Sequence, residues 1–85
     1  MVKRRKLLVK ATTSRNLRFD ELTALVDGFG FILKRISGSH HIYKHPDVPE
    51  ILSLQPDNNG QAKPYQVRTL LRMVEEYALT LKEEE

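Results

Sequence analysis

The sequence contains no cysteine in its 85 residues, which excludes a disulfide framework and a thiolate zinc site as the support of so small a chain. It also lacks any long apolar run, and its first residues carry no signal-like apolar segment, so we expect no membrane span and a cytoplasmic location. The length allows one small domain, because two independent hydrophobic cores need a longer chain. Ordinary hydrophobic packing must therefore hold the fold together.

Acidic residues are absent from the first 18 residues, which carry seven lysines and arginines. Five glutamates lie instead within the last eleven residues, so the formal net charge of +3 hides a strong asymmetry. A basic end suits a polyanion such as nucleic acid, whereas the alternative is the solvated face of a helix or a basic terminal segment. Charge alone leaves both interpretations open.

Hydrophobic spacing and turn residues predict the order helix, three strands, helix. Ser37 and Gly38 form the turn of the first hairpin, and Gly28 is a suitable left-handed stop for the first of these helices. The predicted helices are a short basic helix over 4–11, a helix over 20–26 that ends at Gly28, and a helix from Pro64 to near Thr80. The first predicted strand covers 31–36, the second runs from His40 to Pro46, and the third covers 50–54.

This order predicts an α+β fold with a three-stranded antiparallel sheet. One face of such a sheet must be covered, and the two flanking helices are the elements available to cover it. We expect a basic N-terminal extension at residues 1–18 and the domain proper at residues 19–82.

All three histidines of the chain, His40, His41 and His45, fall within six residues. Along a strand, His40 and His41 point to opposite faces, whereas His41 and His45 share a face about 13 Å apart at about 3.3 Å per residue. Metal ligands lie about 2 Å from their ion, so one ion cannot join these rings. We therefore expect no metal site and no cofactor.

General acid or base chemistry needs a histidine that a substrate can reach, with polar donors nearby. Gly38 allows close backbone approach, and the amides and hydroxyl of the turn at Ser39 suit a phosphate oxygen. A histidine that takes the proton of a ribose 2′-hydroxyl would start RNA cleavage, and Lys44 and Arg35 would offset the developing charge. The alternative is that the histidines only solvate an exposed sheet, and spacing alone favours that alternative.

Residues 28–46 closely resemble the HicA toxin family, small ribonucleases of bacterial and archaeal toxin–antitoxin systems. The hallmark is a glycine-aromatic helix end followed, one strand later, by Gly-Ser-His, here Gly38-Ser39-His40. The similarity continues through residues 54–56 and 62–68 and covers about residues 19–80. The chain departs from the family in its basic extension of about eighteen residues. It also departs after the third strand, where its residues 54–59 read Leu-Gln-Pro-Asp-Asn-Asn and contain no histidine, whereas many members carry one in that segment.

The resemblance implies a fold like a double-stranded RNA-binding domain and an mRNA interferase that a HicB-type antitoxin neutralises. It places the catalytic histidine on His40, with His41 as the alternative because some members carry theirs one position later. The expected substrate-binding residues are Gly38, Ser39, Lys44, Arg35 and Lys63. Lys63 precedes Pro64 at the start of the last helix, where free amides suit a phosphate, although the segment alone favours an ordinary helix start over a phosphate site. The rival function is a non-catalytic RNA-binding module of the same fold.

The basic segment at residues 3–18 is expected to add electrostatic affinity for RNA without taking part in the chemistry. The alternative is that Leu7, Leu8 and Ala11 pack onto the core. In that case the basic side chains form the solvent-exposed side of a structural helix.

Overall fold

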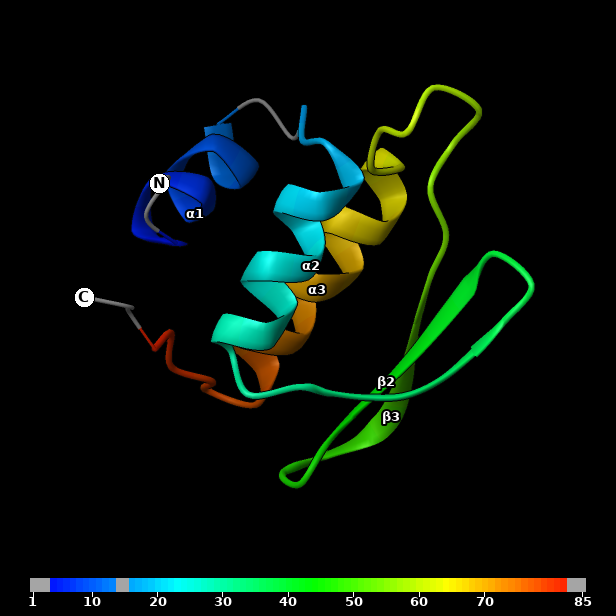
Figure 1. The fold of residues 1–85 in the computed structure, drawn as a ribbon. Helices are drawn as coiled ribbons and strands as arrows, with labels where there is room; N and C mark the ends of the chain where they lie inside the picture. The colour runs from blue at the N-terminus through cyan, green and yellow to red at the C-terminus, as the bar shows by residue number, and fades with distance from the viewer. Residues whose placement is uncertain (1–3, 14–15, 83–85) are drawn as a thin grey trace.

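The computed structural model describes residues 4–13 and 16–82 and forms one α+β unit, as predicted (Figure 1). An N-terminal helix precedes the predicted order of helix, three strands and helix. None of the described helices is long and apolar enough to cross a membrane. The elements are α1 (Arg4–Thr13), α2 (Phe19–Gly28), β1 (Ile32–Ser37), β2 (His40–His45), β3 (Val48–Leu54) and α3 (Pro64–Glu76).

The three strands form an antiparallel sheet in the order β1-β2-β3, and the helices lie on one side of it (Figure 1). Tyr43 of β2 faces Leu52 of β3 in the register, and both side chains are buried against the helices. Side chains alternate along each strand, so the opposite face carries exposed residues such as Lys44 and Ile51. We call this uncovered side the open face.

The core lies between the covered face of the sheet and the helices. The spacing of apolar residues in α2 and α3 places one side of each helix against it, as an amphipathic helix requires. The largest fully buried side chains are Leu17, Leu22, Leu25, Val26, Leu52, Leu54, Val67, Leu70 and Met73.

The N-terminal helix α1 packs into the same core, because Leu7 and Ala11 are buried in it and Leu8 lies against it. Hydrogen bonds from the Arg4 side chain also attach α1 to the rest of the fold. Its Nε donates to the carbonyl oxygen of Ala24 at 3.1 Å, and a terminal nitrogen donates to the carbonyl of Lys82 at 3.3 Å. This packing supports the interpretation of residues 4–13 as a structural helix whose basic side faces the solvent. The predicted domain boundary between residues 18 and 19 stays a prediction.

The end of α2 differs from the sequence prediction. Gly28 is the last helical residue, and the left-handed glycine is Gly30, at φ +95°. Two side chains from distant parts of the chain pack closely on Gly28, since a Cβ there would lie 2.6 Å from Cδ of Arg4 and 2.7 Å from Cδ1 of Leu81. The prediction that Gly28 is the left-handed stop was therefore wrong, because residue 28 is still helical and the left-handed conformation falls on Gly30.

The last helix is shorter than predicted and ends at Glu76 instead of near Thr80. Ala78 breaks it with φ +52°, a conformation that an L-residue rarely adopts. Leu81 still packs against the core, but it does so from the segment after the helix. The apolar pattern correctly predicted that Leu81 packs against the core, but it wrongly predicted that Leu81 lies near the end of a helix.

A polar cluster joins β3 to α3. Glu50 accepts from both terminal nitrogens of Arg72, at 2.8 and 3.3 Å, and from the hydroxyl of Tyr77 at 2.9 Å. The hydrogen bond to Glu50 raises the pKa of Tyr77 to about 12. The hydrogen bonds from Arg72 and then Tyr77 hold the pKa of Glu50 below its usual value. Both oxygens of the Glu50 carboxylate therefore accept hydrogen bonds from residues of α3 or just after it, on the helical side of the sheet.

His45 has a structural role at the end of β2. The backbone N–H of Asp47 donates to Nδ1 at 3.0 Å, so the proton of the neutral ring must lie on Nε2, which donates to the carbonyl of Phe29 at 3.0 Å. The ring also meets Phe31 edge to face, with centroids 5.1 Å apart. His45 therefore fastens β2 to the segment that follows α2.

We predict that Leu7→Ala lowers the free energy of unfolding by about 2–4 kcal/mol, because it removes buried methyl groups from the core. Val9→Ala on the exposed side of the same helix is the control, and it should change stability by less than about 0.5 kcal/mol. Urea denaturation measures both. Equal, small effects would show that α1 does not belong to the core.

We predict that His45→Ala destabilises the fold by about 2 kcal/mol, because the Phe29 carbonyl and the Asp47 amide lose their partner. His40→Ala is the matched control, and its exposed side chain should contribute almost nothing. Nitrogen NMR of the histidine rings should show His45 as the Nε2–H tautomer. An Nδ1–H tautomer would contradict the assigned role.

Candidate functional site

The turn between β1 and β2 consists of Gly38 and Ser39, flanked by the register pair Ser37 and His40. Gly38 has φ +61° and a Cβ there would meet no atom within 4 Å. The backbone conformation, and not lack of space, therefore requires glycine, as at the first central position of a type II′ turn. This tight turn fixes where His40 and His41 begin their strand.

His40 and His41 leave the turn on opposite faces of the sheet. His40 is exposed on the open face, and its ring forms no hydrogen bond to any residue that the structure describes. His41 lies on the covered side, where its ring meets Phe19 edge to face with centroids 4.9 Å apart. The two candidate histidines thus occupy different environments.

A hydrogen bond to the turn orients the ring of His41. Its Nδ1 lies 3.1 Å from the carbonyl oxygen of Ser39. A carbonyl only accepts, so Nδ1 carries the proton and donates it. In the neutral ring Nε2 is then an acceptor, and no group in residues 4–13 and 16–82 hydrogen-bonds to it. This is the arrangement of a general base whose tautomer is held by its neighbour.

Gln55 links the turn to the start of α3. Its Nε2 donates to the hydroxyl of Ser39 at 2.9 Å, and its Oε1 accepts from Nζ of Lys63 at 3.4 Å. Its backbone N–H donates to Oε1 of the buried Gln66 at 3.1 Å, and Gln66 in turn donates to the hydroxyl of Tyr65 at 3.2 Å. One side chain thus connects two residues that the sequence predicted for substrate binding.

These residues meet at one end of the molecule. His41 contacts Phe19, the first residue of α2, and Lys63 is the N-cap of α3, whose first turn contains no acid. The positive end of the α3 dipole and the ammonium of Lys63 therefore act in the same direction, which favours an anion. Chemically, the site offers an imidazole nitrogen, a hydroxyl and a cation.

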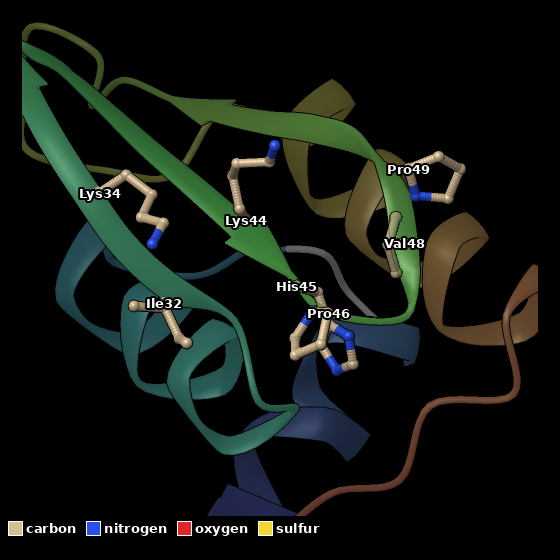
Figure 2. Close-up of a pocket in the computed structure, with 7 residues that line it drawn as sticks. All are labelled: Ile32, Lys34, Lys44, His45, Pro46, Val48 and Pro49. Carbon is tan, nitrogen blue, oxygen red and sulfur yellow. The ribbon is translucent and has the colours of Figure 1, made fainter.

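The structure does not bring Lys44 and Arg35 to this end. Arg35 stands opposite Ile42 in the register, on the open face. Lys44 lies four residues along β2 from His40, about 13 Å at about 3.3 Å per residue, and lines a hollow together with Lys34, His45 and Pro46 (Figure 2). Neither cation is linked to the turn that orients His41, whereas Lys63 is linked to that turn through Gln55.

The covered-side histidines are also held apart. His41 packs on the first residue of α2, and His45 bonds to Phe29 just after its end. A ten-residue helix is about 15 Å long, so one ion cannot reach both rings. In the part of the chain that the structure describes, no three histidine or carboxylate groups are placed to hold a metal ion.

Sequence reasoning missed Gln55, Gln66 and Phe19 as members of the site. Gln66 carried a usable signal, because it interrupts the apolar side of α3 and is the one buried polar residue described. Phe19 was read only as part of the apolar spacing of a helix. Gln55 could not be found from spacing, since its partners lie 16 and 8 residues away.

Residues 19–75 match the family model described as HicA toxin of bacterial toxin–antitoxin. Comparisons with curated proteins and with solved structures gave no match. The matched region runs from the start of α2 into α3 and contains the whole site, while α1 lies outside it. Proteins of this family are generally toxins that cleave mRNA and are paired with an antitoxin. The chain belongs to the HicA toxin family, as its Gly-Ser-His motif predicted.

Proposed function

We propose that this protein is a toxin ribonuclease that cleaves mRNA in the cytoplasm without a metal ion, and that a HicB-type antitoxin neutralises it. The observation that carries the proposal is the ring of His41, whose Nδ1–H donates to the Ser39 carbonyl and whose Nε2 has no hydrogen-bond partner among the described residues. We assign the general base to His41 on this geometry. His40, which the motif favoured, has no comparable hydrogen bond in the described residues.

The proton transfer follows from that ring. Nε2 of His41 takes the proton of a ribose 2′-hydroxyl, and the 2′-oxygen bonds to the adjacent phosphorus. The bond from phosphorus to the 5′-oxygen breaks, and the departing oxygen takes a proton from water. His40 is not its source, since it projects from the other face of the strand. The products are a 2′,3′-cyclic phosphate and a 5′-hydroxyl.

Charge that develops on the phosphate oxygens needs donors already in place. The Lys63 ammonium and the Ser39 hydroxyl are both within reach of Gln55, which hydrogen-bonds to each. Gln55 is itself held by the Gln66 side chain. We propose that Ser39 and Lys63 bind the scissile phosphate, with Gly38 giving the turn its shape.

Replacing His41 by alanine should slow RNA cleavage by about 10²–10⁴-fold, the usual contribution of a general acid or base. His40→Ala should cleave close to the wild-type rate, which makes it the matched control one residue away. The measurement is cleavage of a labelled RNA by purified protein, with circular dichroism to show that both variants are folded.

The opposite result, an inactive His40→Ala and an active His41→Ala, would move the base to the residue that the motif favoured. If both variants cleave normally, the histidine mechanism is wrong. If wild-type protein binds RNA without cutting it, the non-catalytic RNA-binding module is the correct function.

Cleavage should proceed in EDTA, because the proposed chemistry uses a histidine and a lysine and no metal ion. The products should carry a 2′,3′-cyclic phosphate or its hydrolysed form, which mass spectrometry identifies. Strict dependence on an added divalent ion, with 3′-hydroxyl products, would contradict the mechanism.

A further inference from the structure

The edge strand β1 is exposed along its whole length. It pairs with β2 on one side, and no described strand pairs with its other side. Ile32, Leu33 and Ile36 are 52 %, 42 % and 56 % exposed. Proteins usually protect such an edge, because its free N–H and C=O groups accept another strand.

These aliphatic side chains lie on both faces of β1. Ile32 stands opposite Lys44, on the open face, whereas Leu33 and Ile36 stand opposite Tyr43 and His41, on the covered side. The helices cover Tyr43 but leave β1 exposed. A partner that covers all three must therefore reach both faces of the sheet, and a strand added at the edge does this.

Unpaired cations accompany this apolar edge. Lys34 and Arg35 lie on β1 and Lys44 on the neighbouring strand, and none of them has an ion pair among the described residues. Figure 2 shows Lys34 and Lys44 projecting from adjacent strands near Ile32. The only carboxylate within the three strands is Glu50, which is engaged by Arg72 and Tyr77. The surface therefore favours an acidic occupant.

Two other occupants fit less well. Pairing of two β1 edges from two copies would bring the lysine and arginine of one copy near those of the other, and like charges across strands are destabilising. Single-stranded RNA would use aromatic rings for base stacking, whereas the exposed apolar groups here are aliphatic.

We infer that an extended acidic segment of a partner protein adds as a fourth strand to the free edge of β1. Its backbone pairs with β1, its aliphatic side chains cover Ile32, Leu33 and Ile36, and its carboxylates meet Lys34 and Arg35. Ile36 stands directly opposite His41 in the register, so β1 alone separates the added strand from the strand of the proposed base, at about 10 Å or two strand spacings. The inference rests on the proposed antitoxin partnership for its biological role, but the binding stands on exposure and charge.

The test uses isotope-labelled protein and a short capped peptide of alternating valine and glutamate. We expect NMR shifts and slowed hydrogen exchange at the amides of β1, with binding weakened by salt. A peptide with lysine in place of glutamate is the control ligand and should not bind. Lys34→Glu should weaken binding of the glutamate peptide about tenfold, since it turns attraction into repulsion.

Arg68→Glu is the matched control variant, because it makes the same charge change on an exposed residue of α3. It should leave peptide affinity nearly unchanged. Equal weakening by Lys34→Glu and Arg68→Glu, equal binding of both peptides, or an absence of shifts at β1 would overturn the inference.

Two further outcomes would replace the inferred partner. Protection of the β1 amides in the free protein that increases with its concentration would assign the edge to a second copy. Shifts at β1 with an uncleavable RNA oligonucleotide, and none with the glutamate peptide, would assign it to nucleic acid. None of these readouts uses cleavage, so they are independent of the histidine variants.

Discussion

The structure depends on the burial of one face of a three-stranded sheet. Tyr43, Leu52 and Leu54 are covered by the helices, while the opposite face is uncovered. A slip of one residue in the register would exchange the two faces, because side chains alternate. The hydrophobic side chains of β3 make that exchange costly, since Leu52 and Leu54 would be exposed to water. The same constraint decides which histidine is held against the helices and which one projects into solvent.

That alternation gives three neighbouring histidines three different environments. His40 is on the open face without a described partner, His41 is oriented by the turn, and His45 is held by two backbone groups. Both nitrogens of His45 are occupied, so it has no free lone pair for catalysis. His41 has one nitrogen held by Ser39, and its other nitrogen has no hydrogen-bond partner in residues 4–13 and 16–82. The distinction comes from hydrogen bonds to carbonyl and amide groups, and the identity of the residues alone does not contain it.

The order of elements and the fold class could be predicted because apolar spacing, glycine and proline report local structure. The family could be predicted from Gly38-Ser39-His40 in its strand context. The left-handed glycine and the end of α3 could not, since Arg4 and Leu81 pack on Gly28 from distant parts of the chain and α3 ends at Glu76, two residues before the left-handed Ala78. The Gln55 network was likewise invisible, because it depends on where the turn, β3 and α3 meet. The packing on Gly28 and the Gln55 network both join residues far apart in the sequence, so local spacing does not report them.

The charge distribution of the fold follows from which side of the sheet is covered. On the helical side several bases are paired with acids, as Arg72 is with Glu50 and Glu76 and Lys10 with Glu21. On β1 and its neighbour, Lys34, Arg35 and Lys44 have no such partners in the described residues. These cations and the irregular register between Leu33 and Arg35 discourage pairing of β1 with itself, which protects an otherwise apolar edge. A group that repels a second copy attracts an acidic segment, so the same cations that disfavour pairing of two β1 edges favour the acidic occupant inferred for this edge.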